Sequence, residues 1–556
     1  MIGSISKPKW PRRLTENGNE SAPDMNIHSH ELLILGLLLV VAVASSVARR
    51  FSVSYPIVLL IIGLLAGLIP AFPQVRLTPE IVFLVFLPPL LFAAAWQTSW
   101  KEFKFNIVSI SMLAVGLVFF TAFGVAFVIR LFLPAFDWKS GFVLGAVVST
   151  TDAVAASSIA RRLGLPGSVI STLEGESLVN DATGLLALSF TIDFSLHGVT
   201  PSIATEAGRF LWLLLGGAII GLLSGLIGSF LERLGEDGPV AIALSVVVAY
   251  GAYFAGEVVH ASGVTAVVTC GLYMSRQSSR FFSPVVRLQA TAVWDTIEFV
   301  LNGLIFILIG LQLPYVLQGI AGLSPIRMMC YGLIFSALLV VLRSVWMFPS
   351  SYLSYRIRRR LLGQQCAAPD TRTIILMGWV GMCGVVAIAA ASSLPYSFPD
   401  GTPFAQRDMI IFLTFSVVVV TLVAQGLSLR PIIRLLGLRK DDSQNCEAAE
   451  ARKLLIAKAI ELLKTRRDID DESHARAYDD AIIQYQQLSE LILDCGIYVP
   501  EVHGQAEFRQ AMMLDAVRSE REELNILREG GRISDMIFRS IEHELDLHES
   551  KLLALR

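Results

Sequence analysis

The chain has 556 residues, of which 54% are hydrophobic and only 17% are charged, and its formal net charge is −2. A mean hydropathy of +0.61 excludes an ordinary soluble domain of this length, and the nearly balanced charge predicts no nucleic-acid partner. Together these values predict a membrane protein. The six cysteines are scattered over apolar segments, a basic loop and the charged C-terminal region, so they predict no disulfide framework.

Residues 1–30 form a polar N-terminal tail, and the first apolar run leads directly into further apolar segments. We therefore expect no cleavable signal peptide.

About thirteen segments are long enough to cross a membrane as helices, and barrel strands would alternate polar and apolar residues instead. The sequence thus predicts an all-α polytopic membrane protein. The expected spans are 32–48, 55–72, 80–96, 106–131, 138–160, 168–194, 207–232, 238–256, 260–276, 288–313, 327–350, 373–395 and 408–436.

Basic residues gather in every second loop between these spans. One set of loops contains Arg49-Arg50, Arg161-Arg162 and four arginines within residues 356–360, whereas the other set contains few basic residues. Because cytoplasmic loops carry the excess of Lys and Arg, the first set is expected inside the cell. An odd number of spans then places the C-terminus in the cytoplasm and the N-terminus outside.

The membrane part covers residues 31–440, and residues 441–556 are expected to form a helical cytoplasmic domain. Apolar residues recur at helical spacing near 447–464, 476–494 and 506–528, within a highly charged segment. Two interpretations stay open. The segment is either an autonomous helical appendage or a tail that regulates the membrane part or stabilises a dimer.

Three carboxylates lie in the apolar span 168–194, at Glu174, Glu176 and Asp181. Each charged side chain near a bilayer centre costs roughly 2.5–3.5 kcal/mol on insertion scales, so such residues indicate function. Span 138–160 contains Asp152, which lies at a similar depth to Asp181 if the two spans are antiparallel. The expected function is to hold a cation or a proton halfway across the membrane.

The neighbours of Asp181 are suited to a small alkali cation such as Na⁺. Ser177 and Asn180 share its helical face, and Thr151 precedes Asp152. Hard oxygen ligands of this kind bind alkali cations together with backbone carbonyls and water. A carboxylate removed from water can hold a proton or a cation, but not both well, and this competition is sufficient for exchange.

Two spans contain signals for interrupted helices. Polar Thr151 and Asp152 lie inside one apolar span, and the glycine-rich run Gly378-Trp-Val-Gly381-Met-Cys-Gly384 lies inside another. Transporters commonly break helices near the membrane midplane, where the freed backbone lines a site. Two interrupted spans in separate halves of the chain suggest inverted repeats.

Four motifs, in this order along residues 30–440, resemble those of bacterial sodium/proton exchangers, members of the monovalent cation:proton antiporter family and relatives of the animal sodium/proton exchangers. The resemblance implies a dimerisation domain and a core domain with two crossed, partly unwound helices. It also implies a homodimer in the bacterial inner membrane. The expected mechanism is elevator-type transport, without a cofactor or enzyme activity. The motifs are Phe86-Leu-Pro-Pro-Leu-Leu-Phe92, Thr151-Asp152-Ala-Val-Ala, Gly175-Glu-Ser-Leu-Val-Asn-Asp-Ala182 and Glu298-Phe-Val-Leu-Asn-Gly-Leu-Ile-Phe-Ile-Leu-Ile-Gly-Leu-Gln-Leu-Pro314.

Carried over by motif, Asp181 is the carboxylate that binds the cation and the proton. Thr151, Asp152 and Ser177 contribute oxygens or shape the Na⁺ site, and Asn180 braces the unwound segment. The Asn180-Asp181 pair resembles the electroneutral branch of the family. The resemblance therefore implies exchange of one cation for one proton, as part of pH homeostasis, with Li⁺ or K⁺ as other candidate cations.

The chain departs from the family pattern at Cys383, where relatives commonly carry an arginine paired with the glutamate equivalent to Glu176. We hypothesise that Arg343, at another family arginine position, neutralises Glu176, or that Glu176 is protonated. Glu298 and Asn302 are four residues apart on one helical face. They either line the inner cavity or form an interhelical hydrogen bond.

An intramembrane aspartyl protease is the main alternative from another class, because Asp152 and Asp181 could form a catalytic dyad. Such a dyad requires two carboxylates close enough to share a proton and a water molecule. A channel is a weaker alternative, since channels place carbonyls or charges along a continuous pore. Here the acidic residues concentrate at one depth, which favours transport.

Overall fold

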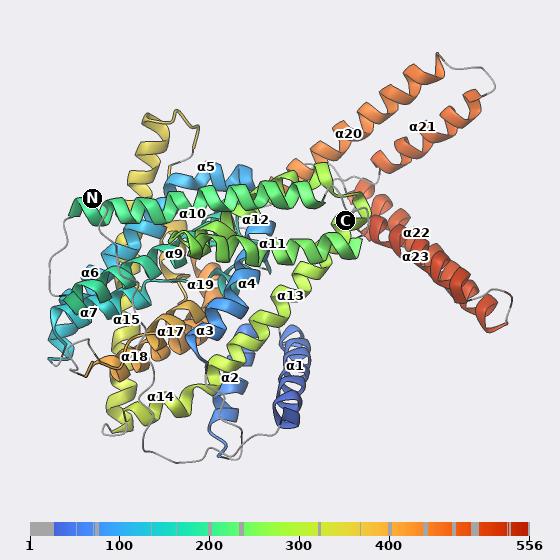
Figure 1. The fold of residues 1–556 in the computed structure, drawn as a ribbon. Coiled ribbons are helices and arrows are strands. Elements are labelled where there is room, and N and C mark those ends of the chain that lie inside the picture. Colours follow the sequence, from blue (N-terminus) through green and yellow to red (C-terminus); the bar gives the residue numbers. More distant parts are fainter. Residues whose placement is uncertain are drawn as a thin grey trace. The chain divides into compact units, whose positions relative to one another are not determined.

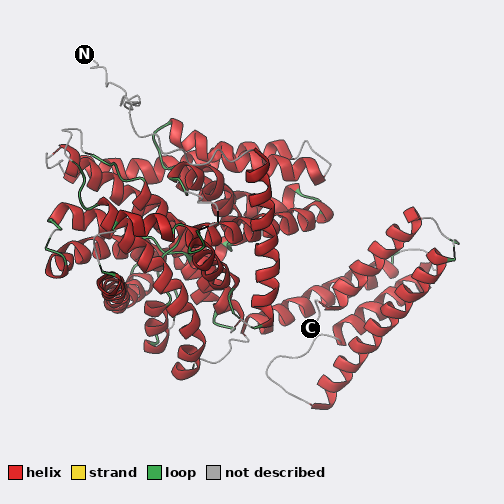
Figure 2. Cartoon of the chain, turned by 90° about the horizontal axis from the view of Figure 1, so that it is seen from below, coloured by secondary structure: helices red, strands yellow, loops and turns green. Residues whose placement is uncertain are grey.

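In the part of the chain that the computed structural model describes, helices are joined by loops and turns, and the β-structure is limited to one isolated bridge between Ser397 and Pro403 (Figures 1 and 2). This confirms the predicted all-α class. Most of the polar N-terminal tail, residues 1–26, lies outside the described residues. The structure describes residues 27–51, 53–70, 72, 77–134, 136–162, 164–197, 203–232, 238–320, 324–366, 368–397, 403–437, 443–469, 474–490, 500–530, 532 and 535–553.

The chain divides into two compact units, one of residues 1–163 and 168–438 and the other of residues 164–167 and 439–556. The helical elements of the first unit are α1 (Ile27–Arg50), α2 (Tyr55–Gly67), α3 (Pro79–Ile81), η1 (Val82–Phe86), α4 (Leu87–Gln97), α5 (Trp100–Ser111), η2 (Met112–Leu117), α6 (Val118–Phe132), α7 (Trp138–Val148), α8 (Ala153–Arg162), α9 (Gly167–His197), α10 (Ile203–Glu232), α11 (Gly238–Val258), α12 (Gly263–Phe281), α13 (Pro284–Leu311), α14 (Leu313–Gly319), α15 (Pro325–Arg360), α16 (Thr371–Trp379), α17 (Val385–Ser392), α18 (Arg407–Val420), η3 (Thr421–Gln425) and α19 (Gly426–Leu436).

Local chemistry explains where several of these helices begin. The Asp137 carboxylate accepts a hydrogen bond of 2.8 Å from the Ser140 amide and caps α7. Ser262 caps α12 in the same way, by accepting from the Thr265 amide at 3.1 Å. Helix α13 begins at a proline, whose fixed φ and missing N–H suit the first helical position.

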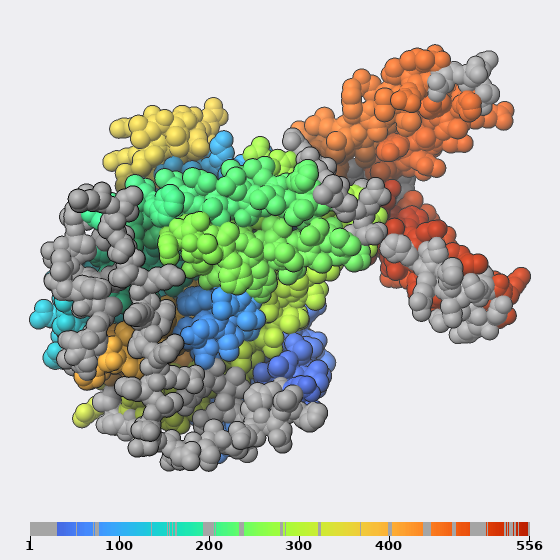
Figure 3. Space-filling view, in the orientation of Figure 1, coloured from blue at the N-terminus to red at the C-terminus, as the bar shows by residue number. Residues whose placement is uncertain are grey.

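Among the described residues, eight helical segments are long and apolar enough to cross a membrane, judged by length and composition. The shorter helices α2 and α7 are also apolar, whereas the carboxylate-bearing α9 is not among the eight. Helix α10 turns most of its surface outward, and Figure 3 shows its green side chains on the face of the first unit. An apolar outward face of this kind is suited to contact with lipid.

Both predicted helix interruptions are present. Helices α7 and α8 are separated by residues 149–152, and α16 and α17 are separated by residues 380–384. The two non-helical segments meet, because the Asp152 amide donates a hydrogen bond of 2.7 Å to the Met382 carbonyl. The contact satisfies two backbone groups that the interruptions remove from helical bonding, as a buried break requires.

The second unit contains α20 (Ser443–Arg467), α21 (Ala475–Glu490), α22 (Pro500–Glu529) and α23 (Asp535–Leu553). Helix α20 packs on α21, and α22 packs on α23, where Arg521 bridges Asp546 at 2.8 Å and Glu549 at 2.7 Å. Cys446 on α20 is disulfide-bonded, a feature that the sequence pattern did not predict. The described free thiols are Cys270, Cys330, Cys366 and Cys383.

Candidate ion-binding site

A cavity of about 270 Å³ lies between α2, α4 and α13 on one side and α8, α9 and the start of α17 on the other. The break between α7 and α8 also contributes to its wall. The polar lining therefore comes from segments that are far apart in the sequence. The predicted site residues that line this cavity are Thr151, Asp152, Ser177, Asp181, Glu298 and Asn302.

The two aspartates reach the cavity from different backbone environments. Asp181 lies on continuous helix α9 and is 8% exposed. Asp152 lies in the break, where one carboxylate oxygen accepts a hydrogen bond of 2.8 Å from the Val154 amide and caps α8. Its other oxygen faces Gly384, since a Cβ there would lie 2.9 Å from Oδ2. Asp152 is thus held in place, whereas no hydrogen bond to the Asp181 side chain is found among the described residues.

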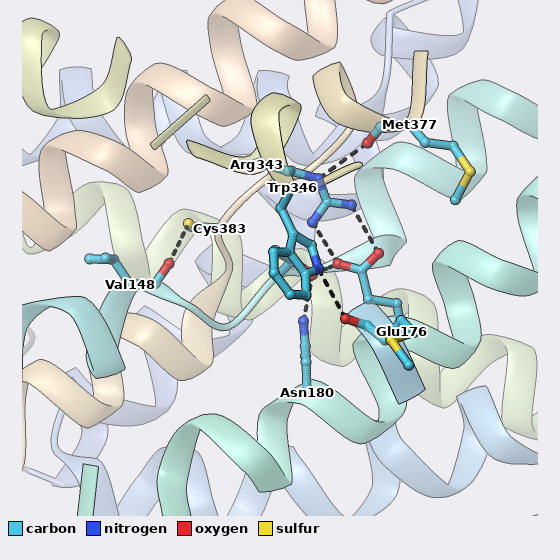
Figure 4. Close-up of polar contacts among 9 residues, drawn as sticks. Val148, Glu176, Asn180, Arg343, Trp346, Met377 and Cys383 are labelled. Carbon is cyan, nitrogen blue, oxygen red and sulfur yellow. Dashed lines mark hydrogen bonds and ion pairs between the residues drawn. The ribbon is translucent and has the colours of Figure 1, made fainter. Parts of the chain in front are cut away.

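Glu176 points away from the cavity and forms a buried ion pair with Arg343 (Figure 4). Two parallel hydrogen bonds of 2.5 and 2.9 Å join the guanidinium to the carboxylate, and the arginine Nε donates to the Met377 carbonyl at 3.2 Å. Glu176 is 1% exposed and Arg343 is 5% exposed. This contact is the one that the Arg343 hypothesis requires, because it places the guanidinium directly on the Glu176 carboxylate.

Cys383, which stands at the position of the expected arginine, has a different contact. Its thiol donates to the carbonyl of Val148, the last residue of α7, at 3.4 Å (Figure 4). Its amide donates to the Thr421 hydroxyl at 3.2 Å. The thiol therefore satisfies a carbonyl that the helix break leaves without an intrahelical partner. Cys383 supports the break and makes no contact with Glu176 among the described hydrogen bonds.

Thr151 connects the break to α9. Its hydroxyl donates to Glu176 at 3.1 Å and accepts from the Asn180 amide group at 2.6 Å. Asn180 is 1% exposed and does not line the cavity. The predicted bracing role of Asn180 is therefore consistent with a direct hydrogen bond to the interrupted segment.

Charged and amide groups from four helices line another part of the same cavity. Gln97 on α4 donates to Glu298 on α13 at 2.8 Å, and Arg161 on α8 pairs with Glu174 on α9 at 2.7 Å. Asn302 lies deeper and is 3% exposed. Glu298 lines the cavity and also forms an interhelical hydrogen bond, so the two predicted alternatives do not exclude each other.

Sequence reasoning missed Tyr55, Gln97, Thr150 and Ser157, which also line the cavity. Tyr55 and Gln97 lie at the ends of apolar spans, where polar or aromatic residues are common and carry no functional signal. Thr150 could have been noticed as a polar residue directly before the Thr151-Asp152 pair. No group of three or more His, Cys, Asp or Glu residues suited to a resident metal ion occurs in the described part of the chain.

Two broken helices that meet beside buried carboxylates are a recurring feature of secondary transporters of ions. The family model described as "Sodium/hydrogen exchanger, transmembrane" matches residues 35–435. The chain therefore belongs to the sodium/hydrogen exchanger family, a family of transporters. This confirms the resemblance that the motifs indicated.

Individual relatives agree with the family match. An uncharacterised Na⁺/H⁺ exchanger of Escherichia coli, YjcE, is 31% identical over 547 residues, which cover 94% of this chain and 98% of the relative. A Bacillus subtilis protein named sodium, potassium, lithium and rubidium/H⁺ antiporter is 32% identical over 404 residues, covering 70% and 60% of the two chains. The solved sodium proton antiporter MjNhaP1 from Methanocaldococcus jannaschii has a similar fold, with a TM-score of 0.55 at 18% identity over 74% of this chain and 100% of that one.

Proposed function

We propose that this chain exchanges Na⁺ for a proton at Asp181, one cation for one proton. The observation that carries the proposal is the pair Asp181 and Asp152, which lines one cavity together with Ser177 and the interrupted segment. Hydroxyl, carboxylate and backbone oxygens are the ligands that a hard alkali cation prefers. No resident cofactor is required, because the transported ions supply the chemistry.

Competition for one carboxylate couples the two fluxes. A cation and a proton each neutralise Asp181, so either can be carried through the apolar interior, whereas the bare charge is costly to move. Glu176 is paired with Arg343 outside the cavity, so this pair adds no net charge to the site. Electroneutral exchange follows if Asp152, fixed at the cap of α8, keeps one ionisation state during the cycle.

The arrangement of helices supports elevator-type movement within a homodimer in the bacterial cytoplasmic membrane. The cavity separates α2, α4 and α13 from α8, α9 and α17, so one group can move against the other. Arg161 and Glu174 line the cavity and lie beside a basic loop. With basic loops and the C-terminus in the cytoplasm, this cavity opens to the inside.

The choice of cation is part of the proposal. Na⁺ is the proposed substrate, with Li⁺ and K⁺ as candidates, because the Bacillus subtilis relative is named for all three and rubidium. The family match gives no support to the alternative of an intramembrane aspartyl protease. Membranes that carry the protein should therefore transport ions and leave helical peptide substrates intact.

The test is dissipation of a pH gradient by Na⁺, Li⁺ or K⁺ in everted membrane vesicles. Wild-type protein should collapse the gradient, and Asp181→Asn should be inactive at the same amount of folded protein. Asp408→Asn is the matched control, since Asp408 is 54% exposed and lies outside the cavity. Lowering the pH should raise the apparent KM for Na⁺ without lowering the maximal rate. Full exchange by Asp181→Asn would contradict the assigned site, and no exchange by wild type would contradict the function.

A further inference from the structure

Two adjacent threonines in the break between α7 and α8 differ in how their hydroxyl groups are used. The Thr151 hydroxyl donates a hydrogen bond to Glu176 and accepts one from Asn180. Its proton and one of its lone pairs are therefore used in hydrogen bonds. Both partners belong to the buried network around Arg343. The Thr151 side chain therefore serves to attach the break to α9.

The Thr150 hydroxyl group forms no hydrogen bond with the described residues. Thr150 is 2% exposed, and its Oγ1 has no hydrogen-bond partner among the described residues. Buried polar groups are normally paired, so a specific unpaired hydroxyl indicates an absent water molecule, ion or other partner. Thr150 lines the same cavity as Asp181, so the unpaired hydroxyl belongs to a residue of the candidate site.

Packing holds Thr150 against the helix that carries Asp181. A Cβ added to Gly184 would meet the Thr150 methyl carbon, so the methyl group contacts α9 one turn beyond Asp181. This contact restricts the Thr150 side chain, which belongs to the cavity wall. Asn180 also has an unpaired oxygen, Oδ1, but Asn180 does not line the cavity.

We propose that the Thr150 hydroxyl oxygen is a ligand of the transported alkali cation, and that Thr151 holds the break in place. The inference rests on the proposed exchange at Asp181 and adds a neutral ligand to it. A neutral oxygen stabilises a bound cation, whereas a proton binds directly to the carboxylate. Losing Thr150 Oγ1 should therefore weaken cation binding and leave proton binding at Asp181 unchanged.

The test compares Thr150→Val, which keeps the shape of the side chain, with Thr150→Ser, which keeps the hydroxyl. In Thr150→Val the apparent KM for Na⁺ and Li⁺ should rise about threefold to tenfold, as expected for one lost polar contact, with the maximal rate retained. Because protons compete better against a weakly bound cation, the acid limit of activity should move to higher pH. Thr150→Ser should stay close to wild type.

Na⁺-dependent thermal stabilisation of the purified protein measures binding independently of transport, since a ligand of the folded state raises its melting temperature. Thr150→Val should need more Na⁺ than wild type for the same shift, and Thr151→Val should instead melt lower without Na⁺. The inference is overturned if Thr150→Val keeps the wild-type Na⁺ response and acid limit. It is also overturned if Thr150→Val and Thr150→Ser lose folded protein equally, which would show a packing role. Failure of the proposed function is distinguishable, because it appears as missing exchange in wild-type vesicles.

Discussion

At the scale of single residues, Glu176 and Asp181 lie on the same helix but have different contacts. Helix α9 carries Asp181 toward the cavity and Glu176 toward α15, so the two carboxylates face different surroundings. Glu176 is fully engaged by Arg343 and Thr151. A buried ion pair contributes little net stability compared with apolar residues, but breaking it leaves one uncompensated charge.

Replacing Arg343 by Gln should therefore destabilise the membrane unit by about 3–5 kcal/mol, because Glu176 would be left buried without its counter-charge. The measurement is the melting temperature of the purified protein and the amount of folded protein in membranes. Arg161→Gln is the matched control, since its pair with Glu174 leaves Arg161 55% exposed and such pairs contribute only about 0–1 kcal/mol. Equal stability of the two variants would contradict the buried role of Arg343.

At the scale of elements, the crossing of the two breaks depends on close backbone approach. A Cβ at Gly381 would meet the Arg343 guanidinium, and one at Gly384 would meet the Asp152 side chain. Glycine is therefore required sterically at both positions. The hydrogen bond from Asp152 to Met382 lies between these two contacts and fixes the register of the crossing.

Gly384→Ala should reduce exchange, because the new methyl group would displace Asp152 from the cavity wall, and overpacking of this kind costs about 1–3 kcal/mol. Initial rates of Na⁺-driven gradient collapse measure the effect. Gly251→Ala on α11 is the control, since a Cβ there would meet nothing within 4 Å. That control should exchange normally and gain slightly in helix stability. Normal exchange by Gly384→Ala would show that Asp152 tolerates displacement.

At the scale of the whole molecule, the chain consists of a membrane unit and a charged helical unit that divide near residue 438. The site residues all belong to the first unit, and the second is built of the helices α20–α23. Arg521 and its two acidic partners stabilise the second unit internally. Each unit therefore has its own internal contacts.

A chain that ends at Leu438 should insert into the membrane and retain exchange that depends on Asp181, because every cavity-lining residue is present. Gradient collapse in vesicles, compared at equal protein amounts, is the measurement. Circular dichroism of residues 439–556 alone should show a helical fold. Loss of insertion on truncation would instead indicate that the tail is needed for folding, and loss of exchange alone would indicate a regulatory tail.

Local patterns in the sequence predicted the helical class, both helix interruptions and six of the polar residues that line the cavity. These features depend on spacing within one segment, such as the four-residue separation of Ser177 from Asp181 or of Glu298 from Asn302. The number of membrane spans stays a prediction, since length and composition identify eight clear segments among the described helices. Tyr55 could not be predicted, because nothing near it in the sequence indicates a cavity.

The sequence by itself determined that the chain is a helical membrane protein and which apolar segments carry carboxylates, because hydrophobic length and the cost of intramembrane carboxylates act locally. Only the tertiary structure decided how those charges are paired. Glu176 and Arg343 are 167 residues apart in the chain, and their contact depends on how α9 and α15 pack. The same packing occupies the Thr151 hydroxyl and leaves the Thr150 hydroxyl available, a difference between adjacent identical residues that no sequence pattern contains.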